Sequence, residues 1–241
     1  MDATKKWPGT LRRRVYLMRH GEVDYFDGQG RPYPVGAVPL NAAGRAQAEA
    51  AAGALAGVPL DRVVTSGLRR CVETAALVAG GRTAEVRPEL REIEPGRFRD
   101  WGGATHEDVR RAILGALDSE VGPETHFLGG ETFGALRARA WPCFQALLAE
   151  PGWRHLLLVA HGVVNRVLLA GVLGAGWAAL SALEQDAGCI NLIEVDDAGR
   201  CLVRLVNHTP AAPLKAGMEM STLELLYWQY SRTRPPGQGG R

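Results

Sequence analysis

The sequence predicts an α/β fold, a three-layer sandwich in which helices cover both faces of a mostly parallel sheet of about six strands. Short apolar runs alternate along the chain with longer segments of helical periodicity, which is typical of a parallel sheet whose strands are buried on both faces. The size is also suitable, because 241 residues with 46% hydrophobic content can bury one full core. We therefore expect a single domain over residues 1–241.

The first half of the chain supplies three of the expected strands. Apolar runs of strand length occupy 13–20, 61–66 and, more weakly, 83–90. The segments between them are alanine-rich or amphipathic and end at glycine, which predicts helices over 41–57 and 68–81.

The pattern changes between residues 97 and 151. Helical segments there are interrupted by the stretch VGPETHFLGGE, and the helix expected over 131–150 contains Pro142. We interpret this region, about 97–151, as a helical insertion or lid over the active site.

The second half of the chain resumes the sheet. The continuous apolar run at 155–161 predicts a buried strand, and a helix is expected to follow over 163–174. Two further strands, over 189–196 and 201–207, are joined through DAGR, which favours a hairpin. The tail from about 208 to 241 contains one amphipathic segment, TLELLYWQY, which is a candidate to cover a sheet edge or to form a homodimer contact.

Charge and composition narrow the class of partner. The chain has 28 basic and 26 acidic residues, and a formal net charge of +2 does not indicate the concentrated basic surface that binds nucleic acid or anionic membranes. The four cysteines lie far apart without a C-x-x-C pair, which favours reduced thiols over a disulfide or a zinc site. The sequence has neither a signal-peptide pattern nor an apolar stretch long enough to span a bilayer. We expect a cytoplasmic protein that acts on a small molecule, with no nucleic-acid or membrane partner.

Two His-Gly pairs follow two of the apolar strands. Arg19 and His20 end the first strand, His161 ends a later one, and each histidine is followed by a glycine, Gly21 or Gly162. Ligands of open parallel sheets bind at the carboxyl ends of the strands, and glycine lets a ligand approach the backbone closely. We therefore expect both imidazoles to face one crevice, beside the N-terminus of the helix that follows the second pair.

This combination of side chains suits a phosphate group, because arginine offers a planar fork of donors that matches phosphoryl oxygens and stays charged. Arg69 and Arg70 occupy adjacent helical positions at another strand-to-helix junction, so only one of them is expected to face the crevice. Glu92, after the third strand, is a candidate proton donor. The remaining histidines lack metal-ligand spacing and are expected to be structural or exposed: His106, His126, His155 and His208. Three further arginines are expected to be solvated: Arg91, Arg97 and Arg99.

Six motifs carry a family resemblance. They are LMRHGE (17–22), VPLNAAGRAQA (38–48), TSGLRRCVETA (65–75), LREIEPG (90–96), GGET (129–132) and LLLVAHGVVNRVLL (156–169). Together they resemble the histidine phosphatase superfamily, which includes cofactor-dependent phosphoglycerate mutases and many phosphomonoesterases. The motifs occur in the family's order and span most of residues 15–170, and this ordered set is far more specific than a lone RHG.

The resemblance implies roles for the residues at these motifs. His20 would be the nucleophile that becomes phosphorylated, and Glu92 the general acid that protonates the leaving alcohol and later helps to deprotonate water. The family's S-x-L-x-R pattern selects Arg70 over Arg69. The phosphoryl-binding groups would be Arg19, Arg70, His161 and Gly162.

The chemistry adds two expectations to these roles. His20 attacks phosphorus only as a neutral ring, so its other nitrogen needs an acceptor, which we expect to be a backbone carbonyl. Two arginines and a protonated His161 would neutralise the phosphoryl group, so we expect no metal and no cofactor.

The segment after the first motif departs from the family pattern. Many members carry a polar series there that ends in Ser or Thr, x, Trp and Asn, whereas this chain has VDYF at 23–26. Compared with those members, this segment lacks the polar side chains that would contact a substrate and has two aromatic side chains instead. We therefore expect Glu22, Tyr25 and Phe26 to line a pocket for an ester other than phosphoglycerate, with an apolar or ring portion.

These observations predict a metal-independent phosphomonoesterase that acts on a small phosphorylated metabolite through a phosphohistidine intermediate. Two alternatives stay open. One is phosphoryl transfer of the phosphoglycerate mutase type, in which the phosphohistidine is shielded from water. The other is non-catalytic binding of a phosphorylated ligand. This alternative is disfavoured because all five residues that the chemistry needs are present: Arg19, His20, Arg70, Glu92 and His161.

Overall fold

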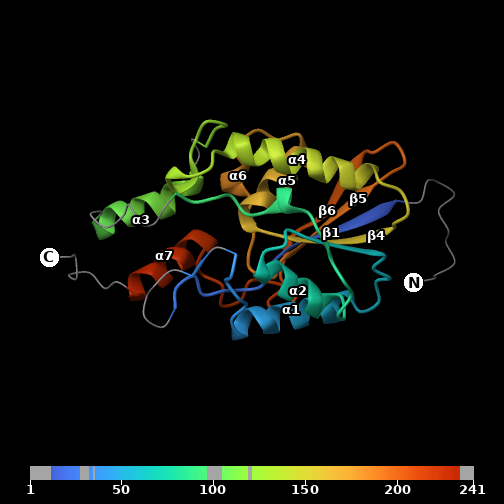
Figure 1. The fold of residues 1–241 in the computed structure, drawn as a ribbon, viewed down its shortest axis with the longest axis horizontal. Helices are drawn as coiled ribbons and strands as arrows, with labels where there is room; N and C mark the ends of the chain where they lie inside the picture. The colour runs from blue at the N-terminus through green and yellow to red at the C-terminus, as the bar shows by residue number, and fades with distance from the viewer. Residues whose placement is uncertain (1–11, 28–32, 35, 97–104, 119–120, 234–241) are drawn as a thin grey trace.

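The computed structural model describes residues 12–27, 33–34, 36–96, 105–118 and 121–233, and Figure 1 shows the fold. The described residues form a six-stranded sheet in the order β3-β2-β4-β1-β5-β6. Its strands are β1 (Arg13–Arg19), β2 (Arg62–Thr65), β3 (Glu85–Val86), β4 (His155–Ala160), β5 (Ile190–Val195) and β6 (Cys201–His208). The first four run parallel to one another, and β5 runs antiparallel to both of its neighbours.

Helices cover both faces of the sheet, which confirms the predicted three-layer sandwich. In Figure 1, α1 (Ala42–Leu55) and α2 (Arg69–Val78) lie below the sheet, and α4 (Phe133–Ala149) and α5 (Gly162–Leu173) lie above it with the short α6 (Ala179–Ala182). The remaining two helices, α3 (His106–Leu114) and α7 (Thr222–Thr233), pack against each other at one end of the molecule.

The two central strands explain why the apolar runs are continuous. Val15 and Leu17 of β1 belong to the core under α4 and α5, whereas Tyr16 and Met18 belong to the core under α1 and α2. The side chains of a strand alternate between faces, so a strand covered on both sides needs apolar residues at every position. β4 repeats the same alternation.

The predicted third strand is much shorter than expected. It was expected over 83–90, but only Glu85 and Val86 pair with β2. The chain then turns at Pro88 into a short 3-10 helix, η1 (Pro88–Leu90), because proline has no N–H for the sheet. The predicted hairpin between the last two strands is present, and the Asp196 N–H donates to the Arg200 carbonyl oxygen at 3.0 Å.

The region predicted as an insertion divides into two parts. Its second part, α4, packs on the sheet and contributes fully buried side chains to the main core, among them Phe133, Leu136 and Phe144. Its first part, α3, lies against α7 instead. The amphipathic segment TLELLYWQY forms α7, and it covers α3 rather than an edge of the sheet.

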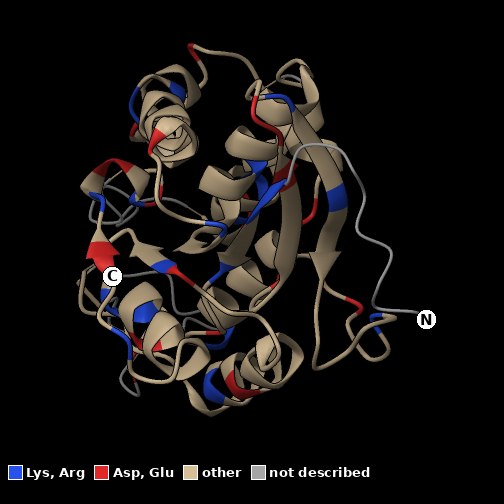
Figure 2. Ribbon diagram, turned by 90° about the vertical axis from the view of Figure 1, so that its right-hand side faces the viewer, with Lys and Arg blue, Asp and Glu red and all other residues tan. Residues whose placement is uncertain are grey.

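Charged residues are interspersed over the described chain, as Figure 2 shows by the mixing of blue and red segments. Within the described ranges, we find no helix that is both long and apolar enough to cross a membrane.

Two glycines bring the loop after β1 into backbone contact with the start of α1. A Cβ atom at Gly21 would lie 2.3 Å from the Gly44 carbonyl oxygen, and one at Gly44 would lie 2.1 Å from the Glu22 carbonyl oxygen. Neither position has room for a side chain. The close approach holds the loop that carries His20 against the helix.

We predict that Gly44→Ala destabilises the protein by about 1–3 kcal/mol, because its methyl group overlaps backbone atoms that have no freedom to move. Gly53→Ala is the matched control in the same helix. A Cβ there meets nothing within 4 Å, so this change should stabilise the protein by about 0.5–1 kcal/mol. Urea unfolding of both variants measures the difference, and equal effects would contradict the proposed close packing.

Candidate active site

The carboxyl ends of three adjacent parallel strands meet in the site. His20 follows β1, Ser66 follows β2 and His161 follows β4, which lies between the other two strands. The rings of the two histidines are 5.2 Å apart, centroid to centroid, and are nearly edge to face. The structure thus brings the two His-Gly pairs side by side, with both rings buried.

The imidazole of His20 is held in one tautomer. Its Nδ1 lies 2.7 Å from the Gly21 carbonyl oxygen, which can only accept, so Nδ1 carries the proton. The Arg70 Nε–H donates to Nε2 at 3.1 Å, which requires a lone pair on that nitrogen. The expected backbone carbonyl is therefore that of Gly21, and Nε2 has the electron pair that a nucleophile needs.

His161 is fully buried beside this ring. Its Nε2 lies 2.8 Å from the Ser66 hydroxyl oxygen and 3.4 Å from the Cys71 sulfur. Burial raises the pKa of the Cys71 thiol to about 12, and the thiol donates to the Ala160 carbonyl oxygen. Cys71 therefore packs against His161 as a neutral group.

The surroundings of both histidines favour the neutral ring. Burial lowers the pKa of His20 and of His161 well below the ordinary value of 6.5, and the positive charge of Arg70 lowers both further. A neutral His20 is suited to attack phosphorus. The protonated His161 expected from the sequence would require the negative charge of a bound phosphate group to offset the nearby arginines.

Arg19 presents an unused donor to the crevice. Its Nη1 donates to the Gln185 carbonyl oxygen at 2.6 Å and to the Thr222 hydroxyl oxygen at 2.8 Å. Its Nε is buried and has no hydrogen-bond partner in the described part of the chain. A Cβ at Gly162 would lie 3.5 Å from this Nε, so the glycine leaves the space around the guanidinium open. A buried donor without an acceptor is suited to bind an anion.

The structure separates the two adjacent arginines of α2. Arg70 is 2% exposed and faces His20, whereas the Arg69 guanidinium is half exposed and pairs with Glu73 at 2.7 Å. Arg91 is exposed, as expected, and Arg97 and Arg99 lie outside the described residues. None of the six histidines borders the pocket described below, including the four that were expected to be structural or exposed: His106, His126, His155 and His208.

Glu92 caps the N-terminus of α5. Its Oε2 accepts from the Val163 N–H at 3.3 Å and its Oε1 accepts from the Ile93 N–H at 3.0 Å. The helix end that the sequence predicts as an anion seat thus donates an N–H to this carboxylate. Glu92 is half-buried and borders the same pocket as Arg19 and Arg70.

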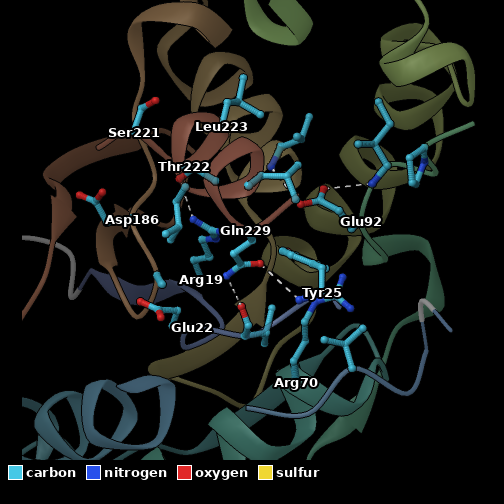
Figure 3. Close-up of a pocket in the computed structure, with 18 of the residues that line it drawn as sticks. Arg19, Glu22, Tyr25, Arg70, Glu92, Asp186, Ser221, Thr222, Leu223 and Gln229 are labelled. Atoms are coloured by element: carbon cyan, nitrogen blue, oxygen red, sulfur yellow. Dashed lines mark hydrogen bonds between the residues drawn. The ribbon is translucent and has the colours of Figure 1, made fainter. Parts of the chain in front are cut away.

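A pocket of about 210 Å³ lies beside Arg19 and Arg70, and Figure 3 shows many of the residues that surround it. His20 and His161 are buried behind this lining and do not border the pocket themselves. Arg19, Arg70 and Glu92 line its floor, and the three predicted pocket residues, Glu22, Tyr25 and Phe26, line it as well. Much of the remaining lining is apolar: Val23, Ile93, Leu117, Phe127, Leu128, Leu223 and Leu226.

Several pocket residues were not identified from the sequence. Arg166 and Asp186 line the pocket, but both are paired with a neighbouring side chain. Arg166 pairs with Glu184 at 2.5 Å, and Asp186 pairs with Lys215 at 2.7 Å. Thr222 and other residues of the C-terminal segment also line it. The amphipathic pattern of that segment predicted a helix, but no local signal indicated what the helix covers.

The described residues contain no group of three or more His, Cys, Asp and Glu side chains placed to hold a metal ion. All four cysteines are free thiols.

Comparison with known proteins gives a consistent result. The family model described as Histidine phosphatase superfamily (branch 1) matches residues 15–208. A glucosyl-3-phosphoglycerate phosphatase of Mycobacterium tuberculosis is 33% identical over 189 residues, covering 71% of this chain and 81% of its own length. An adenosylcobalamin/alpha-ribazole phosphatase of Salmonella typhi is 31% identical, covering 76% and 90%. The solved structure of a mycobacterial glucosyl-3-phosphoglycerate phosphatase with VO3 superposes with a TM-score of 0.65 at 29% identity, covering 81% of this chain and 98% of that one.

We predict that the buried histidines make the protein less stable in mild acid. Each pKa is lower in the folded than in the unfolded state, so below about pH 6.5 the unfolded chain binds a proton that the folded protein excludes. The free energy of unfolding should therefore decrease as the pH is lowered below about 6.5, by up to ~1.4 kcal/mol per pH unit for each histidine. Denaturant unfolding at pH 7.5 and 5.5 should show a smaller loss for His161→Gln than for the wild type. An equal loss would contradict the neutral buried ring.

Proposed function

Since the chain belongs to the histidine phosphatase superfamily, we propose that it is a phosphomonoesterase in which His20 carries the phosphoryl group as an intermediate. The relatives described above are named as phosphatases, which supports hydrolysis of a phosphate monoester. The observation that carries the proposal is the tautomer of His20: Nδ1–H bound to the Gly21 carbonyl, with the Nε2 lone pair facing the arginine-lined crevice.

In the first step, the Nε2 lone pair of His20 forms a bond to phosphorus as the bond from phosphorus to the ester oxygen breaks. Protonated Glu92 gives its proton to the leaving oxygen, so that a neutral alcohol departs. Arg70 turns from Nε2 to the phosphoryl oxygens, and the buried Arg19 Nε–H donates to them as well. The Gly21 carbonyl oxygen stabilises the positive charge that the phosphorylated ring acquires.

In the second step, water attacks phosphorus opposite the nitrogen. The Glu92 carboxylate takes a proton from this water, the phosphorus–nitrogen bond breaks, and its electron pair returns to Nε2 of His20. Inorganic phosphate then leaves. Glu92 ends protonated and ready to act as the acid again, so the cycle needs neither a metal ion nor a cofactor.

We infer that the substrate is a small phosphate ester rather than a nucleic acid, because the charges of the described chain are mixed. The free thiols support a reducing compartment such as the cytoplasm. That the chain forms a homodimer stays a prediction.

His20→Ala should lower kcat for an aryl phosphate on the order of 10⁴-fold or more, because no other group can supply the attacking electron pair. His208→Ala on β6, at the edge of the sheet, is the matched control and should keep wild-type turnover. Acid-labile, base-stable phosphate should be trapped on the wild type and not on His20→Ala. Wild-type activity should persist in excess chelator. Wild-type turnover by His20→Ala would contradict the role of His20 as the nucleophile. Transfer of the phosphoryl group from the enzyme back to phosphoglycerate, in place of release as inorganic phosphate, would identify a mutase.

Glu92→Gln should slow esters of basic alcohols about a hundredfold and activated aryl esters much less, because only a basic leaving group needs a proton. The amide oxygen can still accept the Val163 N–H, so the change preserves this contact with α5. A plot of log kcat/KM against the pKa of the leaving group measures the difference. The same slope for variant and wild type would argue against the general-acid role.

A further inference from the structure

Part of the pocket lining comes from a segment outside the part of the chain that the family model matches. That match ends at residue 208, whereas eight lining residues lie between Met218 and Gln229. Figure 3 shows Thr222, Leu223 and Gln229 of this segment beside Arg19. We call residues 218–229 the C-terminal wall.

Polar contacts seat the C-terminal wall on the catalytic half of the site. The Thr222 hydroxyl accepts from Arg19 Nη1 at 2.8 Å and lies 3.0 Å from a carboxylate oxygen of Glu184. The Gln229 side chain is buried, donates to the Val23 carbonyl oxygen at 2.9 Å and accepts from the Tyr25 N–H at 3.3 Å. The wall thus contacts both the phosphate-binding arginine and the loop that follows His20.

The wall is apolar where it faces the pocket. Leu223 and Leu226 lie there, and they pack with Phe26 and Leu128, which line the pocket too. An alcohol group leaving from phosphorus would enter this apolar space, because Arg19, Arg70 and Glu92 would hold the phosphoryl end of the ester. Burial of apolar surface against such side chains favours an apolar group over a hydrated one.

The charges around the pocket disfavour a second acidic group on the substrate. The cations among its described lining residues are Arg19, Arg70 and Arg166, and the last is already paired with Glu184. Glu22 and Asp186 line the pocket as well. Asp186 is paired with Lys215, whereas Glu22 contacts the neutral side chain of Asn41. Among the described lining residues, a substrate carboxylate would therefore meet Glu22 and find each cation already engaged, by Glu184 or by the phosphate group.

We propose that the C-terminal wall forms an alcohol subsite that selects monophosphate esters of uncharged, apolar alcohols. The proposal rests on the proposed phosphatase function and specifies its substrate class. Thr222 links the subsite to Arg19, so the wall that recognises the alcohol also helps to position a group that binds the phosphate.

Three primary alkyl esters test the preference, since their leaving alcohols differ little in the need for a proton: cyclohexylmethyl phosphate, glycerol 1-phosphate and 3-phosphoglycerate. For the wild type, kcat/KM should be at least about tenfold higher for the cyclohexylmethyl ester than for the glycerol ester. It should be lowest for 3-phosphoglycerate. A preference for either polar ester would overturn the subsite.

Variants of the C-terminal wall test whether its leucines cause the preference for the cyclohexylmethyl ester. Leu223→Asn and Leu226→Asn should each reduce the ratio of kcat/KM for the cyclohexylmethyl ester to that for the glycerol ester about tenfold. Leu214→Asn is the control, because this leucine is 93% exposed in the same part of the chain, and it should leave the ratio unchanged. An unchanged ratio in both wall variants would overturn the proposal.

The wild-type comparison does not depend on whether these variants fold. It also separates the proposed phosphatase function from the proposed alcohol subsite. If a phosphohistidine forms on His20 but the polar esters are hydrolysed faster, only the subsite is overturned. If no ester is hydrolysed and no phosphohistidine forms, the proposed function and the subsite both fail.

Discussion

The parallel pairing of β1 with β4 is the constraint on which the active site depends. Arg19 pairs with Ala160 in the register of these strands, so the residues that follow them, His20 and His161, leave the sheet side by side. Both strands are buried on both faces, and a shift of one residue would exchange the side chains of the two cores. The packing of the sheet therefore sets the separation of the imidazoles more firmly than any contact between the rings does.

The site combines buried neutral rings with buried positive charge, and this arrangement favours an anionic ligand. Burial and the nearby arginines oppose protonation of both histidines, so the ligand-free crevice carries the charge of Arg19 and Arg70. A phosphate ester brings the compensating charge and supplies an acceptor for the buried Nε of Arg19. Binding and activation of the nucleophile thus depend on the same few side chains.

Much of the fold, and the grouping of His20, Arg70 and His161 in the candidate site, could be predicted because their signals are local. A strand that ends in Arg-His-Gly places those residues at a predictable edge of a parallel sheet, and Arg70 follows from its motif. Two features could not be predicted, because they depend on backbone geometry that the sequence does not specify locally. One is the choice of the Gly21 carbonyl as the partner of His20, and the other is the length of β3, which has only two residues. Thr222 could not be assigned because its contact with Arg19 spans 203 positions in the chain, and no short pattern encodes such a contact.

The close approach of Gly21 and Gly44 has a consequence for how the protein can diverge. Backbone touches backbone at these two positions, so a side chain at either glycine would displace the loop that carries His20. Elsewhere, the pocket is lined by side chains of α7, which can change size and polarity while the sheet stays in place. Mutation and selection can therefore alter which alcohols are accepted by changing one helix, while the residues that handle phosphorus remain under strict constraint.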